Sequence, residues 1–209
     1  MQRKSFLGAL GAAIMLIAAA LSPASAQTAA EDIDTSIVLE MTMGSPDAPI
    51  QVIEYSSYTC PYCKRFHTDV FEHLKNEYID TGKVHLTFRE VYFDRPGLWA
   101  AMVARCGGPE RFFGINEMLF DTQEIWSRGE PADVVASLRQ MANSAGINDA
   151  EFDACLSDGV KAQAMVALYQ QNAQRDGIRS TPSFLIDGRL ESNMSLDEFR
   201  ELFDSKLEN

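Results

Sequence analysis

The residues of this chain best suited to do chemistry are two thiols at the spacing Cys-x-x-Cys. Cys60 and Cys63 enclose Pro61 and Tyr62, and this spacing can close a small disulfide ring or hold a metal ion. Disulfide exchange needs one thiol that ionises easily and a second thiol within reach of it. The spacing alone does not choose between the two chemistries, so the choice depends on the elements that position the thiols.

The segments on either side of the pair predict a strand followed by a helix. Residues 50–55 form an apolar run that hardly alternates, which is typical of a strand buried on both faces. Downstream, apolar residues recur at every fourth position, which indicates a helix with one buried face: Phe66, Val70, Leu74 and Tyr78. Cys63 and His67 extend this face toward the start of the helix, so we expect Cys63 to face inward.

Cys60 falls just before the first turn of this predicted helix. Pro61 suits the first helical position, where a missing N–H costs nothing, and unpaired backbone N–H groups lie near the sulfur of Cys60. Those dipoles favour a thiolate. We therefore expect Cys60 to be an exposed nucleophile with a lowered pKa, and Cys63 to resolve the mixed disulfide. This setting favours redox chemistry.

Glu54 is a candidate proton acceptor on the predicted strand. Glu54 and Gln51 have opposite parity there, so one of them must be covered, and Gln51 lies near the start of the strand, where it can reach water. A buried carboxylate at the depth of Glu54 would have a raised pKa and could take the proton of Cys63 during resolution. A rim glutamate paired with Lys64 or Arg65 is the alternative, and the sequence does not separate the two.

The first 26 residues predict an exported protein. Arg3 and Lys4 precede an apolar run over residues 6–21, and residues 24–26 have the small side chains of a signal-peptide cleavage site. The run is shorter than the roughly 20 residues of a membrane span, which argues against an uncleaved anchor. We expect cleavage after Ala26 and a location in the periplasm, where disulfides can form.

Size and charge narrow the possible partners. The chain has 209 residues and a formal net charge of −12, and removal of residues 1–26 takes away two cations and no acids. The mature length suits one domain with a substantial core. Such an acidic chain should not bind nucleic acid or anionic membrane.

The remaining patterns predict strands near both ends and helices between them. Residues 27–35 indicate a mobile leader, and alternation over 37–43 indicates a strand with Ile37, Leu39, Met41 and Met43 on its buried face. Further strands are expected at 84–92, 183–186 and 189–191, the last two joined by the turn signal Asp187-Gly188. Helical patterns cover 98–105, 109–121, 131–145, 152–156 and 160–176, and a capping box at Ser195 opens a last helix.

The motifs together resemble the DsbA-like branch of the thioredoxin superfamily: Cys60-Pro61-Tyr62-Cys63 after a buried strand, Thr181-Pro182 before a later strand, and the helices inserted between them. Residues 47–66, with Glu54 in place, resemble that branch in detail, and residues 180–184 resemble its cis-proline loop. The resemblance covers nearly the whole mature chain.

The resemblance implies both a fold and a site. The fold is α/β, a thioredoxin fold over residues 44–209 with a helical insertion at about 97–176, preceded by a leader and first strand over 27–43. Pro182 would be cis and would face the Cys pair, with Thr181 offering backbone groups to a bound peptide and Tyr62 beside them. One position departs from the pattern, because DsbA oxidases often carry Pro-His where this chain has Pro61-Tyr62, a pair that resembles glutaredoxin. The dipeptide leaves the oxidising strength open.

Two further thiols, Cys106 and Cys155, lie in the helical region. In an exported chain we expect them to form a structural disulfide with each other. A zinc site built from all four cysteines is the alternative, but Cys106 and Cys155 lack the close spacing of a second ligand pair. His67 could ligate copper or zinc together with the Cys pair, although a packed histidine fits the helix pattern better. No metal or cofactor is expected.

The sequence thus predicts an exported thiol:disulfide oxidoreductase that donates its Cys60–Cys63 disulfide to secreted proteins. Isomerase or reductase activity, including a role in copper tolerance like that of ScsC, is the first alternative, and a metal-binding module is the second. The expected partners are unfolded or reduced secreted proteins, together with a membrane redox partner of DsbB type or a reductant of DsbD type. No nucleic acid is expected to bind.

Overall fold

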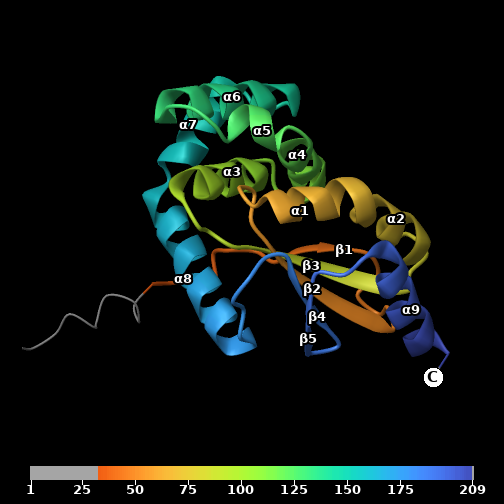
Figure 1. Ribbon diagram of the computed structural model, residues 1–209. Coiled ribbons are helices and arrows are strands. Elements are labelled where there is room, and N and C mark those ends of the chain that lie inside the picture. Colours follow the sequence, from red (N-terminus) through yellow and green to blue (C-terminus); the bar gives the residue numbers. More distant parts are fainter. Residues whose placement is uncertain (1–32, 209) are drawn as a thin grey trace, which may run out of the picture. The chain divides into compact units, whose positions relative to one another are not determined.

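The computed structural model describes residues 33–208, and these residues build a five-stranded sheet with helices around it (Figure 1). In space the strands run in the order β1-β3-β2-β4-β5. Their bounds are β1 Met41–Met43, β2 Ile50–Ser56, β3 Val84–Glu90, β4 Ser183–Ile186 and β5 Arg189–Ser192. The predicted signal peptide over 1–26 and most of the predicted leader lie outside the described residues.

The helical segments fall into three groups along the chain. After the Cys pair come α1 Pro61–Phe66, η1 His67–Phe71, α2 Glu72–Leu74 and η2 Lys75–Ile79. The inserted region holds α3 Arg95–Cys106, α4 Pro109–Asp121, α5 Gln123–Trp126, α6 Pro131–Ser144, α7 Asp149–Ser157 and α8 Gly159–Asp176. The final helix is α9 Leu196–Leu207. The predicted helical patterns of the insertion all form helices, and the short α5 is the one that the periodicity missed.

Strand β2 lies in the middle of the sheet and leads to the segment that holds the Cys pair. It pairs in parallel with β3 and antiparallel with β4, so both of its edges are bonded. Ile50 and Val52 share one core cluster with side chains of the helical stretch after the Cys pair and of α9. On the opposite face, the hydroxyl of Tyr55 donates to Asp176 at the end of α8. The sheet therefore lies between two helical layers, and β2 ends four residues before Cys60.

The first strand is shorter than predicted, and its parity is wrong before residue 41. Only Met41–Met43 pairs with β3, while Ile37 and Leu39 are exposed and Val38 is buried. The carbonyl of Leu39 accepts a hydrogen bond from Arg105 Nη1 at 2.7 Å. A side chain of α3 thus takes an acceptor that a longer strand would use for pairing, and the segment stays irregular.

The hairpin at the other end of the sheet forms where the sequence places it. Asp187 and Gly188 have φ values of 50° and 80°, the left-handed pair that a two-residue hairpin turn requires. β4 and β5 pair from Ser183 opposite Ser192 to Ile186 opposite Arg189. The carboxylate of Asp187 also accepts the backbone N–H of Gln51, which ties the turn to the start of β2.

The helical stretch after the Cys pair contains two π-helical segments, η1 and η2. Positions spaced by four drift about 40° per step around an ideal α-helix, so a strict repeat from Phe66 to Tyr78 would turn away from the sheet. Wider π-helical turns offset this drift. The inward positions of the stretch accordingly remain buried, among them Cys63, Phe66, His67, Leu74 and Tyr78.

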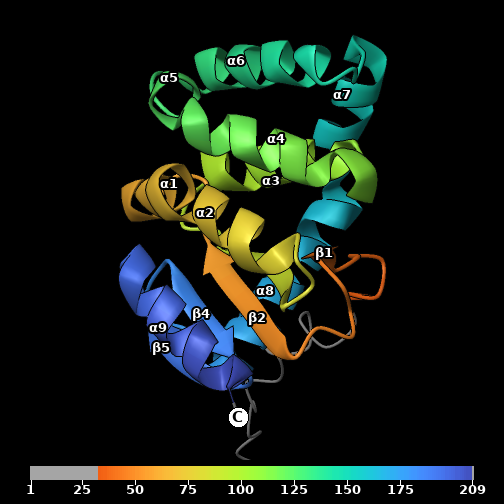
Figure 2. The same ribbon diagram turned by 90° about the vertical axis from the view of Figure 1, so that its right-hand side faces the viewer.

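The inserted helices α3 to α7 lie on the side of α1 that faces away from the sheet (Figure 2). One continuous core cluster joins them to the active-site segment, because it contains Tyr58, Cys60 and Cys63 together with Phe120 and Trp126. The insertion thus forms one wall around the two thiols. Within residues 33–208 no helix combines the length and apolar character needed to cross a membrane.

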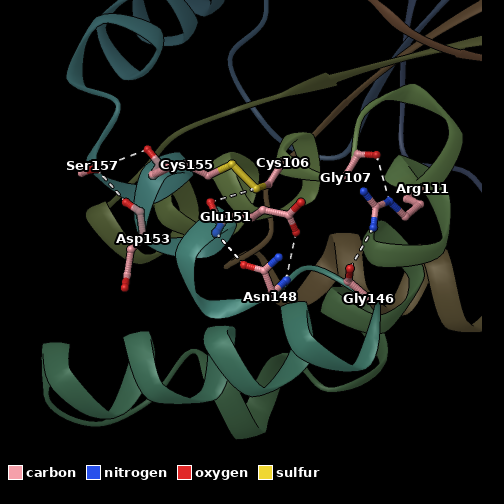
Figure 3. The surroundings of a disulfide bond; sticks show 10 residues. Cys106, Gly107, Arg111, Gly146, Asn148, Glu151, Asp153, Cys155 and Ser157 are labelled. Atoms are coloured by element: carbon pink, nitrogen blue, oxygen red, sulfur yellow. Dashed lines mark hydrogen bonds between the residues drawn. A yellow bond between two sulfur atoms is a disulfide. The ribbon is translucent and has the colours of Figure 1, made fainter.

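Cys106 at the end of α3 and Cys155 in α7 form a disulfide, with their Cα atoms 5.8 Å apart (Figure 3). Hydrogen bonds also fix the start of α7. The side chains of Asn148 and Glu151 each accept a hydrogen bond from the backbone N–H of the other residue. The bond ties an early helix of the insertion to a late one across 49 residues of sequence. The alternative of a four-cysteine zinc site does not agree with this pairing.

Candidate active site

Cys60 occupies the N-cap of α1, in extended conformation, and Pro61 follows within the first turn. The segment before it is fixed by Gln123 of α5, whose side-chain amide donates to the carbonyls of Tyr58 at 2.8 Å and Cys60 at 2.9 Å. Gln123 is buried. The sequence analysis missed this residue, because a single glutamine in a short helix carries no pattern that points to an active-site loop.

The sulfur of Cys60 is less open than predicted, since the residue is only 8% exposed. Its pKa is nevertheless lowered to about 5. The thiol of Cys63, which donates a hydrogen bond to the Cys60 sulfur, makes the largest contribution, and backbone N–H groups of the first turn make smaller ones. Burial acts in the opposite direction. The helix-terminal N–H groups therefore lower the pKa of Cys60, and the neighbouring thiol lowers it more.

Cys63 lies behind Cys60 and is fully buried. Burial raises its pKa far above the ordinary range, and its hydrogen bond to the Cys60 sulfur, which stabilises the protonated form, adds to the rise. The backbone N–H of Ser57 contacts its sulfur at 3.4 Å. The pair therefore consists of one thiol that is ionised at neutral pH and one that keeps its proton.

The loop that contains Thr181 and Pro182 completes the site, although it is far from the Cys pair in the sequence. The peptide bond between Thr181 and Pro182 is cis. The carbonyl of Thr181 lies 3.5 Å from the Cys60 sulfur, although the two residues are 121 positions apart. The predicted neighbours of the Cys pair are thus brought together, and a peptide bound by the Thr181 backbone would lie beside the reactive sulfur.

Tyr62, which lies between the two cysteines in the sequence, is at the surface and is more than half exposed. The guanidinium of Arg65 stands over its ring, 4.6 Å from the centroid. A cation–π contact of this kind holds both side chains in place. Tyr62 itself carries no charge, but Arg65 brings a positive charge to the same surface. The dipeptide Pro61-Tyr62 alone does not predict this charge.

Replacing Tyr62 with histidine is expected to make the disulfide more oxidising. An imidazole adds a donor and a partial positive charge near Cys60, which stabilises the thiolate and lowers the thiol pKa below about 5. The measurement is the redox equilibrium with glutathione, with Tyr62→Phe as the control that keeps the ring over which Arg65 lies. An unchanged potential in Tyr62→His would show that this position does not set the redox equilibrium.

Glu54 is fully buried, which excludes the rim position that the sequence left open. Its Oε1 lies 2.8 Å from Nε2 of His67, and its Oε2 has no hydrogen-bond partner. Lys64 pairs with Glu124 of α5 at 3.3 Å. The carboxylate is thus held under the active-site helix by a histidine that belongs to that helix.

His67 is packed between aromatic rings and bonded to Glu54. Its ring stacks on Phe120 of α4, with centroids 4.0 Å apart and planes 9° apart. No group of three or more potential metal ligands occurs among residues 33–208. The contacts of His67 are therefore those of a packed histidine rather than those of a metal ligand.

The chain is similar to several known proteins. A family model described as Thioredoxin matches residues 36–205. A protein from Rickettsia bellii, whose name assigns it provisionally to the protein-disulfide oxidoreductases, is 29% identical over 171 residues, which are 81% of this chain and 65% of that protein. The chain therefore spans less than two thirds of that relative. Disulfide bond formation protein D from Bacillus subtilis is 25% identical over 185 residues, 82% of this chain and 79% of that protein.

Solved structures agree with the family match. α-DsbA1 from Wolbachia pipientis superposes with a TM-score of 0.73 at 28% identity, covering 82% of this chain and 94% of that one. BdbD from Bacillus subtilis superposes with a TM-score of 0.73 at 25% identity, covering 81% and 94%. These matches confirm the predicted α/β thioredoxin fold with an inserted helical domain. The chain belongs to the thioredoxin superfamily, and its fold is that of the DsbA-like branch.

Proposed function

We propose that this protein is an exported thiol:disulfide oxidoreductase that donates its Cys60–Cys63 disulfide to cysteines of secreted proteins. The observation that carries the proposal is the opposite shift of the two thiols. The pKa of Cys60 is lowered to about 5 and that of Cys63 is raised. A stabilised Cys60 thiolate favours the reduced form of the enzyme, and an enzyme whose reduced form is favoured gives its disulfide away.

The reaction follows from the placement of the sulfurs. A substrate thiolate attacks Cys60 of the disulfide, because this sulfur is the less buried of the two, and Cys63 leaves and takes up a proton. A second substrate thiol then displaces Cys60, which leaves as a thiolate. Thr181, Pro182 and Tyr62 form the surface on which the substrate peptide would lie, and its backbone would bond to Thr181.

Export and partners belong to the same proposal. The charged, apolar and small-residue regions of residues 1–26 support a signal peptide, cleavage after Ala26 and a periplasmic location. Substrates would then be reduced or unfolded secreted proteins. A membrane oxidant of DsbB type would restore the disulfide, whereas a reductant of DsbD type would serve an isomerase. The relative named disulfide bond formation protein D supports the oxidising direction.

Reduction of the Cys60–Cys63 disulfide is expected to raise the melting temperature of the protein, and the gain should grow with pH. The pKa of Cys60 is depressed in the folded reduced protein, to about 5 from an ordinary value near 9. The stabilisation is therefore fully present above about pH 9 and is lost as the pH falls toward about pH 5. Thermal unfolding of both redox forms across this range is the measurement.

A variant supplies the control for this experiment. In reduced Cys60→Ser the pH-dependent gain should vanish, because the titrating thiol is gone. An oxidised protein that is the more stable form at every pH would contradict the oxidising direction and favour a reductase or isomerase.

A further inference from the structure

The short helix α5 of the insertion reaches the loop that carries Cys60. Its first residue, Gln123, is only 4% exposed, and its side-chain nitrogen lies 2.8 Å from the carbonyl oxygen of Tyr58 and 2.9 Å from that of Cys60. An amide nitrogen of this kind carries two hydrogens, so Gln123 can donate to both carbonyls at once. A side chain of the insertion therefore holds the residues on either side of Thr59.

Helix α5 is itself fixed by contacts with its neighbours. Trp126 at its end is fully buried, and the indole N–H donates to the carbonyl of Leu119 in α4 at 2.7 Å. Glu124 pairs with Lys64 of α1 at 3.3 Å. The amide of Gln123 is thus presented from a helix that contacts both α4 and the helix that follows the nucleophile.

The carbonyl of Cys60 lies where the backbone and the sulfur of this residue are closely linked. Besides Gln123, it accepts the backbone N–H of Lys64 at 3.1 Å, at the start of α1. The thiol of Cys63 and backbone N–H groups of the first turn stabilise the Cys60 thiolate. They can do so only while Cys60 keeps its extended N-cap conformation. By holding the carbonyl of Cys60, Gln123 fixes the sulfur of the same residue relative to its donors.

Loss of the Gln123 amide would act on the Cys60 thiolate in one direction. Without this donor, the partial negative charge of the Cys60 carbonyl is less compensated and opposes a negative charge on the sulfur. Two carbonyls held by a buried amide would also lose a hydrogen bond, which favours a loop arrangement that reaches other donors. The thiolate of Cys60 exists only in the reduced protein, so these effects fall on one redox form, whereas a general loss of packing falls on both.

We propose that Gln123 is a positioning residue for the exchange reaction, through which the inserted helices hold Cys60 where its thiolate is stabilised. The inference rests on the proposed function. In the last step of the exchange, a second substrate thiolate bonds to the substrate sulfur held on Cys60, and the bond from that sulfur to Cys60 breaks. Cys60 keeps the electron pair and leaves as a thiolate. The two substrate thiols are thereby oxidised, and the protein disulfide is reduced.

Replacing Gln123 with methionine tests the proposal, because methionine has a similar length and no N–H donor. In the reduced variant the Cys60 ionisation, followed by the ultraviolet absorbance of the thiolate, should have its midpoint about one pH unit above that of the parent. The redox equilibrium with glutathione near neutral pH should shift about tenfold toward the protein disulfide, because the reduced form loses the same stabilisation. Both measurements use folded protein, which circular dichroism verifies.

A matched control and a second substitution make the test specific. Glu124→Gln removes the exposed ion pair of the next residue on α5 and should keep the parent midpoint and equilibrium. Gln123→Glu has the shape of the parent side chain, but an ionised carboxylate cannot donate and adds a negative charge. Its midpoint should rise further than that of Gln123→Met. Gln123→Glu also supplies the test where Gln123→Met does not fold.

A variant with a weakened insertion separates positioning from stability. Replacing Cys106 and Cys155 together with serine removes the disulfide between α3 and α7 and leaves the hydrogen bonds of Gln123 in place. This variant should unfold at lower denaturant concentration and still titrate at the parent midpoint. A midpoint shift as large as that of Gln123→Met would contradict the proposal, because any loosening of the insertion would then have the same effect.

The outcomes also distinguish the role of Gln123 from the proposed function. A parent protein that exchanges no disulfide with glutathione or a reduced protein substrate would overturn the function itself. A parent that exchanges disulfides and ionises at low pH, with folded Gln123 variants at the parent midpoint and equilibrium, would overturn the positioning role alone.

Discussion

Iodoacetamide added briefly to the reduced protein at about pH 6 is expected to alkylate Cys60 at least about 10²-fold faster than Cys63. With a pKa of about 5, most Cys60 is thiolate at that pH, whereas Cys63 keeps its proton. A thiolate of low pKa is intrinsically less nucleophilic, and this offsets part of the difference. Burial adds to the contrast, because Cys63 is inaccessible and Cys60 is 8% exposed.

Peptide mapping of the quenched protein assigns the label. Unfolded protein treated at the same pH is the control, and there the two thiols should react at similar rates, because the contacts that separate them are gone. Faster labelling of Cys63 in the folded protein would reverse the roles of nucleophile and resolving thiol. The same result would remove the basis for the proposed direction of transfer.

Replacing Cys106 and Cys155 together with serine is expected to lower stability by up to about 4 kcal/mol, the loop-closure free energy for a bridge of this separation. That loss is a large fraction of the free energy of unfolding of an ordinary domain. The bridge joins α3 to α7, away from the Cys60 N-cap, so thiol exchange of the folded variant should match the parent. Denaturant unfolding and a glutathione exchange assay measure the two effects.

The disulfide itself can be tested in the parent protein. Mild dithiothreitol should reduce Cys60–Cys63 and leave Cys106–Cys155 intact, and peptide mapping of non-reduced, alkylated protein shows the pairing. Finding Cys106 and Cys155 as free thiols, or joined to the active-site pair, would contradict a structural role. A double serine variant as stable as the parent would show that the helices of the insertion hold together without the bond.

Elements with local signals could be predicted from the sequence. The hairpin at Asp187-Gly188 and the capping box at Ser195 formed as expected, because their signals lie in a few neighbouring residues. The first strand failed because its outcome depends on Arg105, which comes from a distant helix and binds the Leu39 carbonyl. Periodicity predicted the longer helices of the insertion, because their apolar positions repeat over several turns. It missed α5, because four residues make about one turn and show no repeat.

The candidate site was predictable in its parts but not in its contacts. The helix pattern placed Cys63 and His67 on an inward face, and both are buried there. It could not show that His67 meets Glu54, because the strand and the helix each have their own periodicity and only packing sets their relative position. The role of Gln123 was not predicted either. Its two hydrogen bonds go to backbone carbonyls, which every residue has, so no sequence pattern indicates them.

The central claim is that Cys60 of the reduced protein is a thiolate at neutral pH. A titration of the reduced protein, followed by the ultraviolet absorbance of the thiolate, tests it most directly. We expect one ionisation with a midpoint at about pH 5 that is absent from Cys60→Ser, with Cys63 contributing nothing below about pH 9. A first midpoint near the ordinary thiol value of about 8.5 would contradict the account.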